Sequence, residues 1–327
     1  MAKVLHIGPC DSPGGMGNVM RILADHPPEG WQAQLLASHV EGSSWAKWRA
    51  YRRARATLVH MLNDSEQRPD VVHLHTAADW SWWRKRRFAL LAHKAGCKTV
   101  VHIHSGKFDR WLGPPNSQRC KSVQSILKLE HTCAVSLGEA WKSKLEPLIG
   151  ASHSINNPVD PEIKHRKLVR HEHHLLLLGR NDPVKGHDFA CQVAITLRKK
   201  YPHLRLTMTG YDFSERSWIE ARGWVDEGEK QTLLDTASVL LLPSGYEGQP
   251  MVILEAFASG LQVCMNAEIE ISLSSVVRAK HDDLDSWVTT LSTMLDNPIE
   301  ADSLVKEVEP FRCSAVTEQW KLLYESQ

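Results

Sequence analysis

Short apolar runs alternate with amphipathic helical patterns along most of the chain, and this alternation constrains the fold more than any other feature. In the first half, apolar runs predict buried strands over residues 4–8, 70–75, 99–104 and 133–136. Helical patterns between them predict helices over 18–24, 45–62 and 82–95. The second half predicts strands over 175–179, 205–209 and 239–243 and helices over 189–200, 227–236, 251–259 and 284–295. Such alternation favours parallel sheets covered by helices on both faces. The expected class is α/β, with doubly wound, Rossmann-like sheets.

The length of 327 residues exceeds what one hydrophobic core usually supports, which favours two domains. A stretch rich in proline and asparagine over residues 156–161, followed by a polar run over 162–174, predicts the linker. We therefore expect domains over residues 1–160 and 161–310, facing each other across a cleft. Ligands of such sheets bind beyond the carboxyl ends of the strands, so the chemistry is expected there.

Composition excludes several classes of protein. Hydrophobic residues make up 42% and charged residues 24%, which is typical of a globular protein. The seven cysteines include no C-x-x-C pair, which favours reduced thiols in a cytoplasm over disulfides or a zinc site. An apolar leader and a long apolar span are both missing, so we expect a cytoplasmic protein. Residues 1–165 carry 22 basic against 14 acidic residues and the remainder 17 against 24, which suggests different ligands for the two halves but no nucleic acid.

Two cations mark the start of the second half. Arg180 ends an apolar strand, and Lys185 follows it just before a helix. A guanidinium and an ammonium at such a turn suit a diphosphate, although a solvated loop explains the two residues equally well when they are taken alone.

Two carboxylates follow further along the chain. Residues 239–260 run from an apolar strand through a Gly/Ser loop, which contains Glu247, into a helix that begins near Pro250. The backbone N–H groups at that helix start can bind a phosphate or a sugar hydroxyl. Glu255 lies about one turn into this helix among apolar residues, where a carboxylate without a partner is costly.

Taken together, these motifs resemble the signature of glycosyltransferase family 4, in which Arg, Lys-Gly and E-x7-E occur in this order. The segments 206–210 and 223–225 are also similar to the second-domain pattern of that family. The resemblance extends over nearly the whole chain. It implies a GT-B fold, a nucleotide-sugar donor, no metal-binding D-x-D, and transfer with retention of the anomeric configuration.

The resemblance also implies roles for individual residues. Arg180 and Lys185 would neutralise the departing diphosphate, which gains negative charge in the transition state. Glu247 would contact hydroxyls of the transferred sugar, and Glu255 would hold the donor ribose. The donor-binding residues so implied are Gly15, Arg180, Lys185, Trp224, Val225, Glu247, Gly248, Gln249, Pro250, Met251 and Glu255, with Trp224 and Val225 near the base. We expect a UDP-sugar as cosubstrate, with no metal and no further cofactor.

The first half supplies candidates of its own. A glycine-rich turn over residues 12–17 lets a backbone approach a phosphate, and Gly15 corresponds to a donor-contacting glycine of the family. His104 ends a strand, where structural burial is the commoner role, but the family places a functional histidine here. Lys107 and Arg110 are candidates for acceptor contacts. Residues 311–327 resemble the closing helix of GT-B enzymes, which packs back on the first domain.

Two helical segments, residues 45–55 and 79–87, combine basic residues with tryptophans. Such helices can lie on an anionic membrane that carries a lipid-linked acceptor, which would place the protein at the inner face of the membrane. A solvated helix surface with tryptophans packed inward explains the same pattern. Both alternatives stay open at this point.

Other features favour structural explanations. Asp283 and Asp285 match D-x-D, but they start a helix, so capping explains them better. His171, His173 and His174 predict a solvated loop in the linker. After Gly260 the family usually has a Pro-Val step and a Gly-Gly loop, whereas this chain has Gln262 and Asn266 in that segment, which predicts a reshaped donor pocket or a turn closed by Asn266.

The function we expect is that of a retaining, metal-independent hexosyltransferase acting in the synthesis of a bacterial polysaccharide, glycolipid or other glycoconjugate. Its acceptor would be a glycan, a lipid-linked glycan or a small molecule. A catalytically silent, nucleotide-binding GT-B scaffold is the alternative from a different class. Another GT-B enzyme, such as a sugar phosphorylase or an epimerase, is the third.

Overall fold

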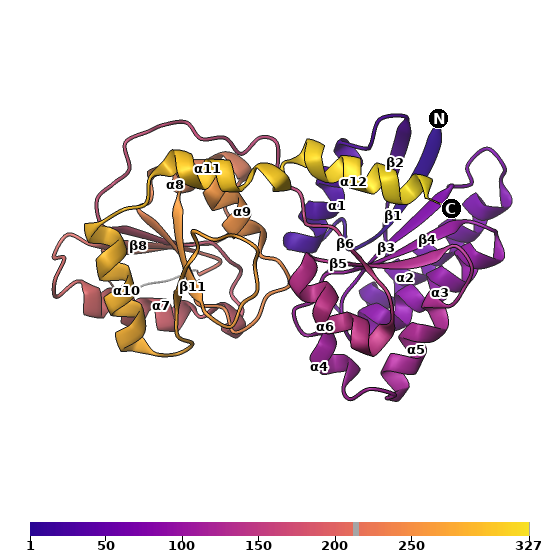
Figure 1. Ribbon diagram of the computed structural model, residues 1–327, viewed down its shortest axis with the longest axis horizontal. Coiled ribbons are helices and arrows are strands. Elements are labelled where there is room, and N and C mark those ends of the chain that lie inside the picture. Colours follow the sequence, from indigo (N-terminus) through magenta and orange to yellow (C-terminus); the bar gives the residue numbers. More distant parts are fainter. Residues whose placement is uncertain (212–215, 327) are drawn as a thin grey trace. The chain divides into compact units, whose positions relative to one another are not determined.

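The computed structural model describes residues 1–211 and 216–326 (Figure 1). The chain forms two compact units. The first comprises Met1–Pro158 and Cys313–Gln327, and the second comprises Val159–Arg312. Each unit contains one six-stranded sheet in which every pairing is parallel. The expected α/β class, with two Rossmann-like sheets, is confirmed.

The first unit has the strand order β2-β1-β3-β4-β5-β6. Its strands are β1 (Ala2–Gly8), β2 (Trp31–Ala37), β3 (Val71–Thr76), β4 (Lys98–Ile103), β5 (Thr132–Ser136) and β6 (His153–Ser154). Its helices are α1 (Gly15–Asp25), α2 (Ser44–Asn63), α3 (Trp80–Lys94), α4 (Phe108–Leu112), α5 (Gln118–Leu127), α6 (Glu139–Ile149) and α12 (Cys313–Glu325).

Alternation along the strands separates two faces of this sheet. One face is an apolar core in which Leu5, Leu74 and Val101 pack with helices such as α2, α3 and α5. The other face carries histidines and is covered by α12 (Figure 1). Trp320 and Tyr324 of α12 are buried against these histidines.

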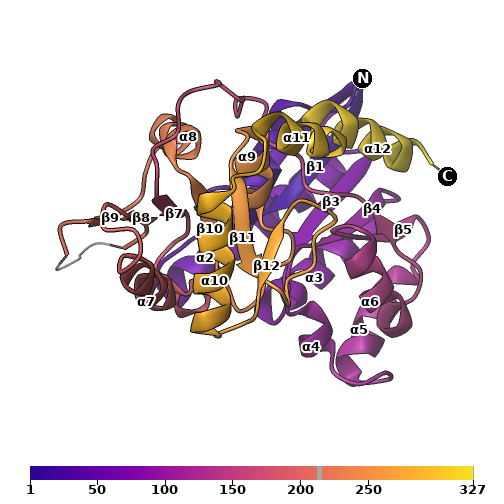
Figure 2. The ribbon, with the colours of Figure 1, turned by 60° about the vertical axis from the view of Figure 1, so that its left-hand side comes forward.

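The second unit has the strand order β12-β11-β10-β7-β8-β9. Its strands are β7 (His174–Leu177), β8 (Arg205–Thr209), β9 (Ile219–Arg222), β10 (Val239–Leu242), β11 (Gln262–Asn266) and β12 (Val277–Ala279). Its helices are α7 (His187–Leu197), α8 (Glu227–Thr236), α9 (Met251–Ala258), α10 (Leu284–Asp296) and α11 (Ala301–Glu307), with 3-10 turns at Pro183–Lys185 and Glu309–Phe311. Helices α7 and α10 pack against each other (Figure 2), and their buried side chains share one apolar core with the sheet.

The strand orders place one switch point in each sheet. In the first sheet the chain reverses its direction of travel between β1 and β3, and in the second sheet between β7 and β10. In open parallel sheets, ligands bind outside the carboxyl ends of the strands at such points. The loops that follow β1, β3, β7 and β10 are therefore the segments where a site is expected.

Several details differ from the sequence predictions. His174 does not lie in a solvated loop: it starts β7 and is buried, and its Nε2 lies 2.9 Å from Thr207 Oγ1. The residues that follow His174 in β7 are apolar and buried, and the histidine that begins the strand is buried with them. Asp283 caps α10 as predicted, because its side chain accepts a hydrogen bond from Ser286 N. Within the described residues, no helix is long and apolar enough to cross a membrane.

Candidate active site

The turn after β7 is built by a close approach of two backbones. Gly210 has φ +66°, and a Cβ there would lie 2.3 Å from Gly179 O and 2.5 Å from Arg180 Cα. Thr209 Oγ1 accepts a hydrogen bond from Gly179 N at 2.9 Å. Only glycine allows this approach, so β8 fixes the backbone of Arg180 at the carboxyl end of β7. The Arg180 side chain is exposed there.

The predicted Lys185 and Glu247 are brought together. Lys185 Nζ lies 2.6 Å from Glu247 Oε1, and both side chains are mostly buried, with exposed fractions of 22% and 14%. The lysine ends a 3-10 turn whose next residue, Gly186, has φ +73° and would clash with Pro243 if it carried a Cβ. The loops after β7 and β10 thus meet, and they hold a charge-assisted hydrogen bond at the switch point of the second sheet.

Glu255 forms a separate pair. It lies on α9 with 2% of its surface exposed, and Lys230 Nζ on α8 lies 3.0 Å from its Oε1. Burial raises the pKa of Glu255, and Lys230 opposes that rise. Burial alone would lower the pKa of Lys230, but Glu255 and Glu227 outweigh it and raise that pKa. The cost of the buried carboxylate is thus offset by a lysine that sequence reasoning missed.

The other donor-side candidates differ in exposure. Gly248, Gln249 and Pro250 are buried at the start of α9, where Pro250 occupies the N-cap position and provides no side-chain cap. Met251 is the first helical residue and is 6% exposed. Trp224, in contrast, is 68% exposed, and Val225 beside it is partly buried. The backbone just before Trp224 is bonded to the Gly210 turn, because Gly210 N donates a hydrogen bond to Gly223 O at 2.9 Å.

The segment after Gly260 is ordered by amide side chains. Gln262 starts β11, its Nε2 donates to Ser238 O and Met294 O, and its Oε1 accepts from Ile299 N. Asn266 ends β11 and donates to Ser244 O at 3.0 Å, while its Oδ1 accepts from Glu268 N. The turn is closed by Asn266, as one of the two sequence interpretations predicted.

The glycine-rich turn of the first unit packs tightly on itself. Gly15 is exposed at the first position of α1, after Gly14 with φ 122°. A Cβ on Gly17 would lie 2.5 Å from Ser12 O and 3.0 Å from Pro9 O, so the loop closes over the first turn of the helix. The backbone N–H groups at the start of a helix can bind a phosphate at such a turn.

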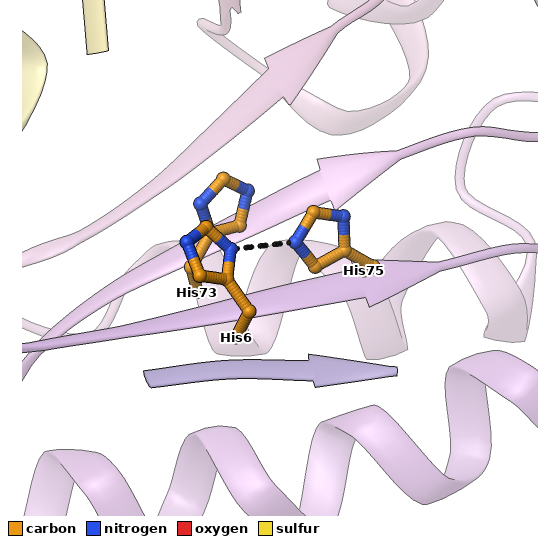
Figure 3. Close-up of side chains that lie close together, drawn as sticks. All are labelled: His6, His73 and His75. Atoms are coloured by element: carbon orange, nitrogen blue, oxygen red, sulfur yellow. Dashed lines mark hydrogen bonds between the residues drawn. The ribbon is translucent and has the colours of Figure 1, made fainter. Parts of the chain in front are cut away.

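His104 belongs to a row of five histidines that lie on or directly after β1, β3 and β4. The strand registers pair His6 with His73 and His75 with His102. His6 Nδ1 is hydrogen-bonded to His75 Nε2 (Figure 3). The two nitrogens lie 2.9 Å apart, and His75 Nδ1 lies 2.9 Å from His104 Nε2. His104, at the carboxyl end of β4, is therefore held by a hydrogen-bonded chain that reaches back to β1.

A second chain runs beside the first. Tyr324 Oη on α12 lies 2.7 Å from His73 Nδ1, and His73 Nε2 lies 3.1 Å from His102 Nδ1. Burial lowers the pKa of each of these histidines, to about 3 for His6 and about 3 for His104, where Lys85 adds to the effect. Neutral imidazoles suit such chains, because each ring has one donor and one acceptor nitrogen.

The geometry of these rings bears on metal binding. Within the described residues, His6, His73 and His75 form one group with ring nitrogens within 4.8 Å of one another, and His75, His102 and His104 form another. The rings of His73 and His75 are stacked 4.3 Å apart with an interplanar angle of 7°. A metal ion must lie close to the plane of every ring that ligates it, which two stacked rings cannot satisfy without turning. The first group therefore fits a hydrogen-bonded core better than a preformed metal centre.

The candidate acceptor residues lie next to His104 in sequence. Lys107 precedes α4 and Arg110 lies within it, and both side chains are exposed. Lys107 N donates to Ser105 Oγ at 3.2 Å, which shapes the turn between β4 and α4. The sequence-predicted residues of the first unit thus lie at the carboxyl edge of its sheet.

Comparison with known proteins gives the class to which this architecture belongs. Residues 172–297, most of the second unit, match the family model described as Glycosyl transferases group 1. A glycogen synthase of Mycobacterium tuberculosis is 26% identical over 277 residues, covering 76% of this chain and 66% of the relative, so the matched region falls just short of two thirds of that relative's length. The fold is similar to that of a sucrose-phosphate synthase from Thermosynechococcus elongatus, with a TM-score of 0.71 and 15% identity over 99% of this chain and 98% of the other.

A second solved structure shares the whole fold. It is an E. coli protein described as trehalose-6-phosphate bound with UDP-2-fluoro glucose, with a TM-score of 0.70, 12% identity and full coverage of both chains. The chain therefore has the GT-B fold, and most of its second unit is similar to the glycosyl transferases of group 1. The narrower assignment to family 4 stays a prediction.

Proposed function

We propose that the chain transfers a hexose-type sugar from a nucleotide diphosphate, with a UDP-sugar as donor, to a hydroxyl group of a glycan, lipid-linked or small-molecule acceptor. The observation that carries this proposal is the Lys185–Glu247 pair beside Arg180, at the switch point of the second sheet. Lys185 donates one of its three N–H groups to Glu247, so it retains donors for a diphosphate.

The proposed roles follow from the chemistry of the groups. Lys185 and Arg180 stabilise the negative charge that develops on the departing diphosphate, and fixed cations are effective there because they need no reorganisation. Glu247 accepts hydrogen bonds from hydroxyls of the sugar while it orients Lys185. Glu255 has one oxygen bonded to Lys230, which leaves the other for the ribose.

The first unit supplies the remaining roles in this proposal. Gly15 offers a backbone approach to the donor, and His104 orients the reacting sugar or the acceptor hydroxyl, with its tautomer set by His75. Lys107 and Arg110 contact the acceptor. We further propose that transfer retains the anomeric configuration and requires no metal ion, as the resemblance to family 4 implies.

Substitution at the charge pair tests this function. Lys185→Ala and Glu247→Ala should each lower turnover of a UDP-sugar by at least about 100-fold, the scale on which loss of one preorganised charge-stabilising group acts. Lys200→Ala is the matched control, because Lys200 forms an ion pair with Asp296 at 2.7 Å on the exposed surface of the same unit. Turnover is measured by release of UDP, with and without EDTA, and NMR of the product gives the anomer.

The outcomes separate the candidate functions. A silent scaffold predicts nucleotide binding without turnover in the unaltered chain. A phosphorylase predicts a requirement for inorganic phosphate. Full turnover in Lys185→Ala refutes the assigned roles, and loss of turnover with EDTA refutes metal independence.

A further inference from the structure

A cavity of about 510 Å³ opens on the first unit, outside the residues assigned to transfer above. Its lining residues lie at the start of α3 and on α4 and α5. Helix α5 packs on both α3 and α4 (Figure 1). Its lining consists of tryptophans, arginines and one carboxylate: Asp79, Trp80, Trp83, Arg86, Arg87, Trp111 and Arg119. The volume falls within the range of about 300–1,000 Å³ in which proteins bind small ligands.

Three arginines and one carboxylate belong to this lining. Among the described residues none of the three forms an ion pair, and Arg86 Nε is buried without a hydrogen-bond partner. Arg119 is held in place, because one of its nitrogens donates to Trp111 O at 2.7 Å and its guanidinium lies 5.6 Å from the centre of that ring. Planar, unpaired guanidinium groups in a concavity suit carboxylate or phosphate groups of a ligand.

Aromatic rings give the cavity a second chemistry. Trp80 is 77% exposed and Trp83 is 40% exposed, which is unusual for such large apolar side chains. Trp111, in contrast, is only 7% exposed and provides a fixed wall. The faces of pyranose rings carry C–H groups that stack on indole rings, so tryptophans beside arginines fit a charged sugar better than a simple anion.

The carboxylate is positioned by an uncommon backbone. Asp79 has φ 57° and ψ −131° just before α3, and its side chain makes no capping hydrogen bond with the helix. Non-glycine residues held in sparsely populated conformations cluster at ligand sites. A carboxylate that is not used as a cap can accept hydrogen bonds from sugar hydroxyls, whereas it opposes the approach of a uniformly anionic surface.

The place of the cavity in the fold links it to transfer. Asp79 and Trp80 follow β3 at the switch point of the first sheet, and Trp111 lies on the helix that follows His104. We propose that this cavity binds an anionic segment of a sugar chain, whose carboxylate or phosphate groups pair with the arginines while its rings stack on Trp80 and Trp83. The proposal rests on the proposed function in identifying this sugar chain as the acceptor.

Binding to the full chain tests this directly. Isothermal titration calorimetry is carried out with tri-galacturonic acid, with a phosphorylated maltotriose, with neutral maltotriose and with inorganic phosphate. We expect one or both of the anionic sugars to bind at least tenfold more tightly than maltotriose and than phosphate. Binding of tri-galacturonic acid indicates a carboxylate glycan, and binding of the phosphorylated sugar alone indicates a phosphoglycan.

Variants assign the binding to the cavity. Trp80→Ala and Arg87→Gln should each weaken binding of the anionic sugar at least tenfold, since both side chains line the cavity and are exposed enough to be replaced without disturbing the core. Trp45→Ala and Arg55→Gln are matched controls, because both residues are exposed on α2 and outside the lining. The controls should bind as the unaltered chain does.

Three results overturn the proposal. One is binding of no sugar, and a second is equal binding of maltotriose and the anionic sugars. The third is binding only to phosphatidylcholine vesicles that contain phosphatidylglycerol, lost in Trp80→Ala, which assigns the surface to a membrane instead. Binding of UDP, measured on the same samples, reports on the proposed function separately, so that either can fail while the other stands.

Discussion

Acidification from pH 7 to pH 5.5 should destabilise the first unit more than the second. Its sheet holds four fully buried histidines, His6, His73, His75 and His102, and burial lowers the pKa of each below the ordinary value of 6.5. Because these groups bind protons in the unfolded chain but not in the folded one, stability falls as the pH falls below 6.5. The free energy of unfolding is therefore highest above pH 6.5 and decreases as the pH falls below that value.

The magnitude follows from linkage. For a histidine with a pKa of 6.5 when unfolded and far lower when folded, the change from pH 7 to pH 5.5 costs about 1.2 kcal/mol. Four such groups cost about 5 kcal/mol, which is comparable to the total stability of many domains, about 5–15 kcal/mol. We therefore expect the first unit to lose most of its stability near pH 5.5.

Hydrogen exchange read by mass spectrometry resolves the two units. After correction for the intrinsic effect of pH, peptides over β3 and β4 should exchange more than 100-fold faster at pH 5.5. Peptides over β7 and β10 should exchange only about tenfold faster, because burial lowers the pKa of one histidine of the second sheet, His174, to about 4. His102→Asn should reduce the pH dependence by the share of one histidine, and His60→Asn, at an exposed position of α2, should leave it unchanged. Equal protection of β3 at both pH values would refute the reasoning.

Two further predictions concern the second unit. Gly210→Ala should destabilise it by roughly 1–3 kcal/mol, because a Cβ meets Gly179 O at 2.3 Å and the residue has a positive φ; a urea-unfolding midpoint equal to that of the unaltered chain contradicts this. Lys230→Met should cost about 3–5 kcal/mol, since it leaves Glu255 buried without its partner. The double variant Lys230→Met with Glu255→Leu should recover much of that loss in the same unfolding experiment, and no recovery would mean that the lysine acts otherwise.

The sequence predicted best what is local. The pattern of strands and turns predicted that Arg180, Lys185 and Glu247 follow strands of the second sheet. In the structure, Arg180 and Lys185 follow β7 and Glu247 follows β10. Helices with a clear period and a capping residue, such as α8 and α10, were predicted within a residue or two of their observed bounds.

What the sequence could not predict depends on register. The histidine row forms only because β1 and β3 pair His6 with His73, which no single strand encodes. Lys230 was missed because an exposed-looking lysine on an amphipathic helix gives no sign of a partner 25 residues away. The edge strand β2 was also missed, since its sequence WQAQLLA has exposed and partly buried positions and lacks a continuous apolar run.

Binding of nucleotides tests the central claim, that the second unit holds the diphosphate of a sugar donor, most directly. In a thermal-shift panel of UDP-, GDP-, ADP- and TDP-sugars, a donor at 100 times its Kd stabilises the folded chain by about 2.7 kcal/mol. We predict that the UDP-sugars raise the Tm and that the rise is lost in Lys185→Ala but kept in Lys200→Ala. A panel in which no nucleotide sugar raises the Tm, or in which Lys185→Ala keeps the full rise, contradicts the claim.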